Sequence, residues 1–395
     1  MKITGVKLSV LETHAPAREF DLVRLPGLIR DRWLHGGTAT PPRGTPAGQG
    51  SGAGDRKRHD MVMHVYTDEG IEGMCTAVAD GYGRVHPDDV PQLARLVAGE
   101  DPLDREKLYQ KLHTGTRWVY RSQGWFGAFD NCLWDIAGKA AGMPVYALLG
   151  RVRERVPCYL NIRGRTKEEA ADDARRAMSE GFIATKDHFY HAVPENIAWL
   201  TAVREAVGPD IDLMHDPVAI YDYQDALKVG RALEELEYRW LEEPLPERQH
   251  NLMQKLCDAL DIPVLAPETL MNDVDLQAQY VISGATDMIR GNARHGSTAV
   301  LKLAHFAELY GTTVELNGAG GLYGLVHAHL LSAISNTTYY EFFPGGHNDE
   351  AAREIGVMNP VVPEDGHIAA PSAPGWGAEW DMDRFRRIVV AEYGA

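Results

Sequence analysis

The sequence predicts an α/β protein in which a (β/α) barrel is joined to an α+β N-terminal capping domain. Between residues 211 and 343, short apolar runs end in a single acidic or polar residue, and a helix-like segment fills each interval. Asp216, Glu242 and Glu268 follow one another at intervals of 26 residues. A repeated strand and helix unit indicates a parallel sheet, and about eight such units close into a barrel. The chain of 395 residues is long enough for such a barrel and a second domain.

The N-terminal part of the chain, residues 1–153, is expected to form the capping domain. Alternating side chains predict a strand over residues 2–12 and a hairpin over 61–75, and helical patterns follow at 87–98, 102–113 and 125–141. Residues 36–54 are rich in Gly, Pro, Ser and Thr, so a mobile lid is expected near residues 20–58. Trp33 and His35 belong to this lid and are candidate substrate-binding residues.

Residues 154–345 are expected to form the barrel. Its first two strands are predicted at 157–161 and 182–186. The later strands are predicted to end, in order, at Asp216, Glu242, Glu268, Asp287, Asn317 and Glu341. The Pro/Gly-rich residues 346–395 are expected to return to the capping domain and pack on it.

Composition and charge limit the classes of molecule that the protein is expected to bind. A formal net charge of −16 argues against nucleic acid and anionic membranes, because the field of the molecule repels them. The four cysteines are scattered and show no spacing typical of a metal site. The first residues alternate like a strand and not like a signal sequence, and no apolar run reaches the length of a membrane span. These observations predict a cytoplasmic protein that acts on a small molecule, with no nucleic-acid or membrane partner.

The polar residues at the strand ends are expected to meet at one mouth of the barrel, where barrel enzymes carry their chemistry. Carboxylates from Asp216, Glu242 and Glu268 would form an all-oxygen site there, of the kind that suits Mg²⁺. Removing a proton next to a carboxylate creates an enediolate with additional negative charge. A divalent cation can neutralise that charge as it forms.

The ordered motifs of the chain resemble those of the mandelate racemase subgroup of the enolase superfamily. They are AFDNCLWDIAGKAAGMPVYALLG, GFIATKDH, LMHDP, WLEEP, VLAPE and the D-x-x-R of DMIR, and they extend over nearly the whole chain. The resemblance implies an enolase-type modified barrel that binds Mg²⁺ through Asp216, Glu242 and Glu268. It implies Glu242 rather than Glu243 as the ligand, and alternation along a strand agrees that only one of the two faces inward. Barrel enzymes of this family are often symmetric, so a homo-oligomer is expected.

The resemblance also implies the groups that move protons. The second strand of the family commonly carries Lys-x-Lys, and this chain has Lys186 and His188 at the two positions. His188 is the expected proton acceptor and Lys186 its electrostatic neighbour. Asp287 matches an acid that pairs with a strand-seven histidine, but this chain has Asn317 at the histidine position, and asparagine cannot transfer a proton.

Three further residues are candidates for contact with the substrate. Glu341 matches a family acid that hydrogen-bonds the substrate carboxylate, and it could stabilise the enediolate if its pKa were raised. Arg290 is expected to hold Asp287 or a substrate oxygen through its fork of donors. His295, in the loop after strand six, could replace the missing strand-seven histidine.

These expectations predict a Mg²⁺-dependent lyase acting on a sugar acid. The enzyme would remove the proton α to the carboxylate and expel the β-hydroxyl, giving a 2-keto-3-deoxy acid. One alternative is an isomerase, either an epimerase or racemase or a cycloisomerase acting on a sugar acid. Another is a non-catalytic homologue that keeps the metal site, with Asn317 as its sign.

Overall fold

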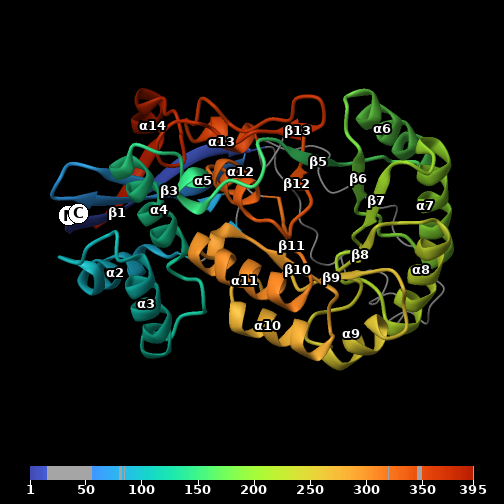
Figure 1. Cartoon of the computed structure of the whole chain (residues 1–395). Helices are drawn as coiled ribbons and strands as arrows, with labels where there is room; N and C mark the ends of the chain where they lie inside the picture. Colours follow the sequence, from blue (N-terminus) through green and yellow to red (C-terminus); the bar gives the residue numbers. More distant parts are fainter. Residues whose placement is uncertain (16–55, 80–81, 84, 319, 345–348, 395) are drawn as a thin grey trace.

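The computed structural model describes residues 1–15, 56–79, 82–83, 85–318, 320–344 and 349–394. These residues form two sheets, an antiparallel N-terminal sheet and a larger curled sheet of parallel strands (Figure 1). The expected lid near residues 20–58 falls almost entirely outside the described residues, and so do Trp33 and His35. The domain boundaries near residues 153 and 345 stay a prediction.

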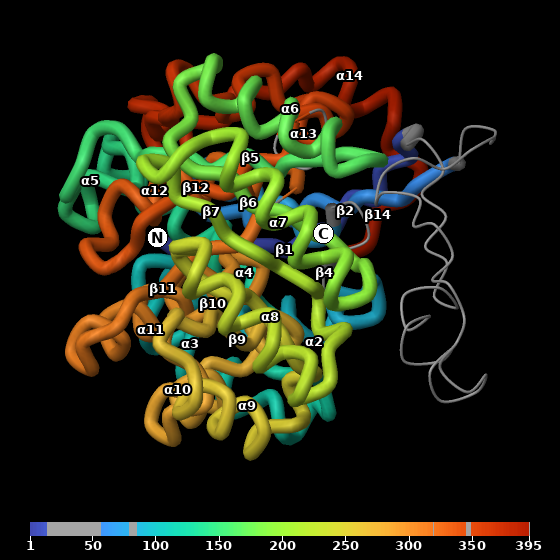
Figure 2. Tube along the Cα trace, turned by 90° about the vertical axis from the view of Figure 1, so that its right-hand side faces the viewer, coloured from blue at the N-terminus to red at the C-terminus, as the bar shows by residue number. Residues whose placement is uncertain are grey.

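The N-terminal sheet has the strand order β14-β1-β2-β3-β4. Its strands are β1 (Ile3–Ala15), β2 (Arg56–Thr67), β3 (Glu72–Ala79), β4 (Tyr82–Gly83) and β14 (Val389–Gly394). The predicted hairpin is present: the Thr67 hydroxyl accepts from the Ile71 amide and donates to the Ile71 carbonyl, which closes the turn. β14 pairs with β1, so the end of the chain lies on the N-terminal sheet (Figure 2).

One helix joins the N-terminal sheet to the rest of the chain. The helical elements here are η1 (Pro87–Asp89), α2 (Val90–Val97), α3 (Arg105–Val119), α4 (Gly127–Ala141) and α5 (Val145–Leu149). Buried residues run without a break from Gly127 to Gly138 in α4. A helix that is buried on all sides must pack between layers, and α4 contacts both β3 and the helices that follow strand β10.

The curled sheet has the strand order β11-β10-β9-β8-β7-β6-β5-β12, and all of these pairings are parallel. The strands are β5 (Val156–Asn161), β6 (Ala184–Asp187), β7 (Asp212–His215), β8 (Trp240–Glu242), β9 (Val264–Ala266), β10 (Met288–Gly291), β11 (Val314–Leu316) and β12 (Tyr340–Phe342). The short strand β13 (His367–Ile368) adds antiparallel to β5. This is the predicted barrel architecture.

Helices between the strands cover the outside of the curled sheet (Figure 1). They are α6 (Lys167–Ser179), α7 (Val193–Val207), α8 (Tyr223–Glu235), α9 (His250–Cys257), α10 (Val274–Ser283), η2 (Ala293–His295), α11 (Ser297–Tyr310) and α12 (Tyr323–Ala333). The C-terminal segment adds α13 (Glu350–Glu354) and α14 (Met382–Ile388). None of the helices in the described part of the chain is long and apolar enough to cross a membrane.

The inside of the barrel is filled by an apolar cluster. Its members come from six successive strands and from the residue before β12: Tyr159, Ala184, Met214, Trp240, Leu265, Met288 and Tyr339. Successive side chains of a strand point to opposite faces, so the residues two positions later also point inward, one layer nearer the carboxyl ends. The apolar cluster is therefore the floor on which the polar residues at the mouth rest.

A buried side chain links the two end strands of the curled sheet. Glu315 in β11 accepts hydrogen bonds from the backbone amides of Thr338 (3.1 Å) and Tyr339 (3.4 Å), just before β12. It also accepts from the Thr338 hydroxyl at 3.0 Å. Burial raises the pKa of Glu315, but these donors favour its ionised form.

The predicted end of strand six is wrong. Strand β10 spans Met288–Gly291, so Asp287 precedes it instead of ending it. The Asp287 carboxylate accepts from the Val264 amide at 2.9 Å, at the start of β9. Asp287 therefore lies at the amino ends of the strands, on the side of the sheet away from the expected mouth.

Helix α4 docks on the segment that follows β10. Asp130 accepts from the Thr298 amide (2.8 Å) and hydroxyl (2.7 Å) at the start of α11. Asn131 accepts from the Ser297 amide at 2.9 Å and donates to the Ala293 carbonyl at 2.7 Å. At Gly127, an added Cβ would overlap the backbone from Arg294 to Gly296. The position of η2 thus depends on close approach of the N-terminal helix.

We expect Glu315→Ala to lower the free energy of unfolding by about 2–4 kcal/mol, because the amides of Thr338 and Tyr339 lose their acceptor. Thermal unfolding followed by circular dichroism measures the change. Arg175→Ala is the control, since Arg175 makes an exposed ion pair with Asp172 that is worth about 0–1 kcal/mol. Equal shifts in the two variants would contradict the role of Glu315.

We expect Gly127→Ala to destabilise the protein by about 1–3 kcal/mol, because the new methyl group forces η2 away from α4. Gly115→Ala is the matched control: Gly115 lies in helix α3 with open space around it, so alanine fits there without strain. A melting temperature of Gly127→Ala at or above that of Gly115→Ala would refute the close approach.

Candidate active site

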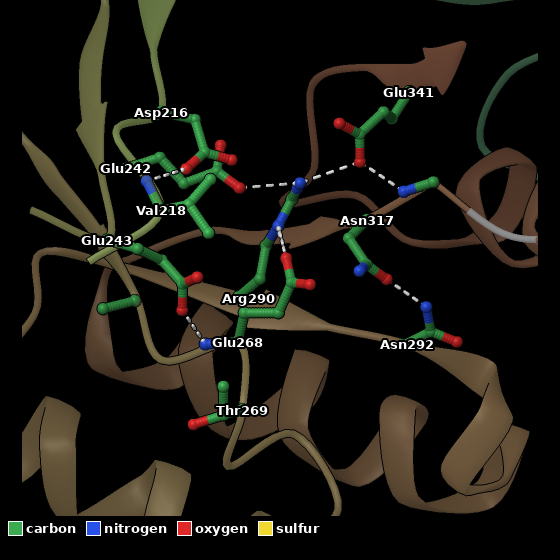
Figure 3. A network of polar contacts seen from close by, with 12 residues as sticks. Asp216, Val218, Glu242, Glu243, Glu268, Thr269, Arg290, Asn292, Asn317 and Glu341 are labelled. Atoms are coloured by element: carbon green, nitrogen blue, oxygen red, sulfur yellow. Dashed lines mark hydrogen bonds and ion pairs between the residues drawn. The ribbon is translucent and has the colours of Figure 1, made fainter. Parts of the chain in front are cut away.

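Charged side chains form the layer above the apolar floor of the barrel. Each charged residue lies two positions further along the chain than a residue of the floor. The pairs are Ala184 and Lys186, Met214 and Asp216, Trp240 and Glu242, Met288 and Arg290, and Tyr339 and Glu341. All five charged residues are buried. Figure 3 shows Arg290 reaching between the carboxylates of Glu242 and Glu341. The period of two along each strand thus brings the predicted residues of five strands to one place.

Lys186 is a centre of positive charge in this layer. Its Nζ lies 3.0 Å from Glu242 Oε2, 2.7 Å from Glu341 Oε1 and 3.3 Å from Asp216 Oδ2. Burial lowers the pKa of Lys186, but Glu242 and Glu341 outweigh it and hold the pKa well above its ordinary value. In this arrangement Lys186 carries its proton.

Arg290 is the second centre of positive charge. Its Nη2 lies 2.8 Å from Glu242 Oε1 and 2.8 Å from Glu341 Oε2, and its Nε is 3.8 Å from Glu268 Oε2. The expectation that Arg290 holds Asp287 is wrong, because Arg290 points into the barrel from the middle of β10 whereas Asp287 lies before that strand. Arg290 Nη1 is buried and has no hydrogen-bond partner in the part of the chain that the structure describes.

His188 follows β6 and meets the same layer from its edge. Its Nε2 lies 3.2 Å from Asp216 Oδ2. Burial lowers the pKa of His188, but the Asp216 carboxylate more than compensates and raises it above the ordinary value. The ring also lies 5.9 Å from that of Phe343, which follows β12. Lys186 in β6 and His188 just after it therefore both approach Asp216.

The three predicted metal ligands lie around the two cations. Lys186 is shared by Asp216 and Glu242, and Arg290 is shared by Glu242 and Glu268. Glu243 turns away from this group: its Oε1 accepts from the Glu268 backbone amide (Figure 3). Oxygen-only donors of this kind suit a hard cation such as Mg²⁺. As placed, no three acidic, histidine or cysteine side chains of the described residues are grouped closely enough to hold an ion.

Glu341 does not have the raised pKa that stabilising the enediolate as an acid would require. Burial would raise it, but Lys186 and Arg290 lower the pKa of Glu341 to about 2. Glu341 also accepts from the Gly318 backbone amide. An ionised Glu341 accepts hydrogen bonds and does not donate one, so in this arrangement it orients the two cations.

A pair of amide side chains lies at the ends of β10 and β11. Asn317 follows β11, and its Oδ1 accepts from Asn292 Nδ2 (Figure 3). Sequence reasoning missed Asn292, which follows β10 directly. The signal was available, because Asn292 is two residues beyond Arg290 and so continues the inward-facing positions of that strand. Asn292, and not Asp287, is thus the polar residue at the carboxyl end of strand six.

His295 does not face the mouth. It lies in η2 and lines a small cavity with Tyr109, Gln123 and Gly124 of the N-terminal region. An added Cβ at Gly124 would contact the His295 side chain. The structure therefore brings Lys186, His188, Asp216, Glu242, Glu268, Arg290, Glu341 and Asn317 together, and it separates His295 and Asp287 from them.

Two family models match the chain. One is described as "Enolase C-terminal domain-like" and matches residues 169–384. The other is described as "Mandelate racemase / muconate lactonizing enzyme, N-terminal domain" and matches residues 49–150.

Curated relatives match over most of their length. A "D-galactonate dehydratase family member" from Catenulispora acidiphila is 26% identical over 358 residues, which cover 81% of this chain and 82% of the relative. "Arabinonate dehydratase" from Saccharolobus solfataricus is 26% identical over 329 residues, with 80% and 87% covered.

A solved structure shares the whole fold. D-glucarate dehydratase from Agrobacterium tumefaciens, crystallised with magnesium, is 28% identical and covers 99% of this chain and 100% of its own, with a TM-score of 0.82. The enolase-type fold predicted from the sequence is confirmed by this likeness and by the family models. Since one of these models covers more than half of the chain, the protein belongs to the mandelate racemase and muconate lactonizing enzyme family of the enolase superfamily.

Proposed function

We propose that the protein is a Mg²⁺-dependent acid-sugar dehydratase. It removes the proton α to the substrate carboxylate and expels the β-hydroxyl, so that the product is a 2-keto-3-deoxy acid. The names of the relatives support this reaction class, since they include an arabinonate dehydratase and a D-glucarate dehydratase. As a hydro-lyase of this family, the enzyme needs a base, a group that holds the carboxylate and a way to release water.

The observation that carries the proposal is the contact of Lys186 and His188 with the carboxylate layer. His188 Nε2 is 3.2 Å from Asp216, and Lys186 Nζ is within 3.3 Å of Asp216 and Glu242. Both potential proton carriers thus border the place where an anionic substrate would bind through a cation. The arrangement fits proton abstraction next to a carboxylate.

The donor chemistry assigns Asp216, Glu242 and Glu268 as the residues that would hold Mg²⁺. When bound, Mg²⁺ would supply positive charge beside the substrate carboxylate. His188 is the base that accepts the α-proton, and Lys186 supplies positive charge beside it. Arg290 and Glu341 hold each other and Lys186 in position.

Expulsion of the β-hydroxyl needs a proton for the leaving oxygen. His188 carries one after the first step, and it can return that proton to a hydroxyl on its own side of the substrate. The carbon–oxygen bond then breaks, water leaves, and the enol product converts to the keto acid. This sequence does not require a histidine at position 317, so Asn317 is compatible with dehydration.

We expect the Mg²⁺-loaded protein to convert at least one aldonic or aldaric acid to a 2-keto-3-deoxy acid. His188→Asn and Lys186→Met should each lower kcat by about 10²–10⁴-fold, because each removes a group that moves or stabilises a proton. A keto-acid assay and proton NMR in D₂O measure the reaction. His191→Asn is the control: His191 lies just beyond β6 but packs against Trp199 of α7, so its loss should leave kcat nearly unchanged.

Other outcomes of the same experiment identify the alternatives. Deuterium exchange or a new diastereomer without keto acid would indicate an isomerase. Binding of Mg²⁺ and of sugar acids without any proton exchange would indicate a non-catalytic homologue. Either result would contradict the proposed dehydration.

We expect Glu242→Gln to weaken Mg²⁺ binding at least about tenfold, because a carboxylate ligand becomes a neutral amide. Isothermal titration with MgCl₂ measures the affinity without reference to turnover. Glu243→Gln is the matched control, since this neighbour contacts the Glu268 amide and is not a predicted ligand. Equal losses in both variants would contradict the choice of Glu242.

A further inference from the structure

The side-chain amides of Asn292 and Asn317, at the ends of β10 and β11, form an amide pair whose hydrogen bond has a fixed direction. The Arg294 backbone amide donates to Asn292 Oδ1 at 2.7 Å, and a backbone amide can only donate. The side-chain atom of Asn292 that faces Arg294 is therefore its oxygen, and Nδ2 of Asn292 faces Asn317. Asn317 Oδ1 accepts a hydrogen bond from this Nδ2. The Arg294 guanidinium, which also can only donate, lies 3.4 Å from the same Oδ1. Two independent donors thus orient the Asn317 amide.

The orientation leaves one donor of the pair unused. With Oδ1 turned to Asn292, Asn317 Nδ2 lies on the other side of the amide, away from Asn292 (Figure 3). No residue in the described ranges accepts a hydrogen bond from this Nδ2. Asn317 is at the mouth, beside the Gly318 amide that binds Glu341.

A buried histidine holds the two loops of the pair at a fixed separation. His327 Nε2 accepts from the Ala293 amide at 3.0 Å, next to Asn292. The backbone of Asn317 also hydrogen-bonds His327. Burial lowers the pKa of His327 to about 3, so the ring stays neutral and keeps one donor and one acceptor nitrogen. The fold therefore holds the two segments that carry Asn292 and Asn317 in place.

The pair lies across the barrel from Lys186 and His188. Strands β7, β8 and β9, which carry the predicted metal ligands, separate β6 from β10 in the sheet. A substrate held above those ligands is flanked by the proton carriers on one side and by the amide pair on the other. The side chains of Asn292, Arg294 and Asn317 can donate hydrogen bonds but have no proton to transfer near neutral pH.

We infer that Asn317 binds a hydroxyl oxygen of the sugar acid through its Nδ2, and that Asn292 positions Asn317 for this contact. The inference rests on the proposed function and assigns a specificity-determining residue to the same site. Asn317 touches the substrate and selects for a hydroxyl on the side away from His188. Asn292 does not touch the substrate; it acts by accepting from Arg294 and presenting its own amide nitrogen to Asn317.

Four variants test the inference: Asn317→Asp, Asn317→Ala, Asn292→Asp and the double variant Asn292→Asp with Asn317→Ala. Asn317→Asp keeps the acceptor for Asn292 but replaces the donor, so kcat/KM should fall about 10–100-fold. Asn292→Asp places an oxygen opposite Asn317 Oδ1 and should turn the Asn317 amide, with a similar loss. In the double variant, Asn292→Asp should add little to the loss caused by Asn317→Ala.

Two readouts separate binding from a structural effect. The first is kcat/KM on the sugar acid that the wild type converts fastest. The second is the Kd of the same acid, measured for each variant in a Lys186→Met background. This Kd should rise as kcat/KM falls. Asn251→Asp is the control, because it adds the same charge on the exposed surface of α9 and should change neither value.

The outcomes distinguish the inference from the proposed function. An active wild type whose Asn317→Asp variant keeps kcat/KM and Kd would overturn the inference alone. Additive losses in the double variant would overturn the positioning role of Asn292. A wild type that binds sugar acids without converting them would refute the dehydratase, and the Kd series would still test Asn317. A wild type that neither binds nor converts any of the acids would overturn both.

Discussion

Buried positive and negative charge must balance at the carboxyl ends of the barrel strands, and the mouth of this protein is built around that constraint. Lys186 and Arg290 lie among the carboxylates of Asp216, Glu242 and Glu341, all of them shielded from water. An isolated charge in such a place costs several kcal/mol, so each ion depends on its partners.

The rest of the fold serves to hold that layer in place. The apolar floor from Tyr159 to Met288 sits directly below it and fixes the inward direction of each strand. Glu315 links β11 to the residues just before β12, and α4 docks on η2. These contacts join segments far apart in the sequence, so the geometry of the mouth depends on the packing of the N-terminal region as well as on the barrel.

The mouth is chemically asymmetric. The β6 side carries Lys186 and His188, which can take up and release protons, whereas the ends of β10 and β11 carry Asn292 and Asn317, which cannot. A mechanism that moves protons on both faces of the substrate needs a proton-transferring group on each side of the mouth. Among the described residues, such groups lie on the β6 side but not at the ends of β10 and β11. This asymmetry is the physical reason for favouring elimination on the His188 side over racemisation.

The sequence by itself determined the alternation of strands and helices and the convergence of Lys186, Asp216 and Glu242, because apolar period and strand length are local properties. It misplaced the end of strand six, since a strand of only four residues shows little alternation, and so it chose Asp287 over Asn292. Only the tertiary structure decided which carboxylates share Arg290, why Glu341 stays ionised and which way the Asn317 amide points. Those facts arise from contacts across the barrel, which no local pattern in the chain encodes.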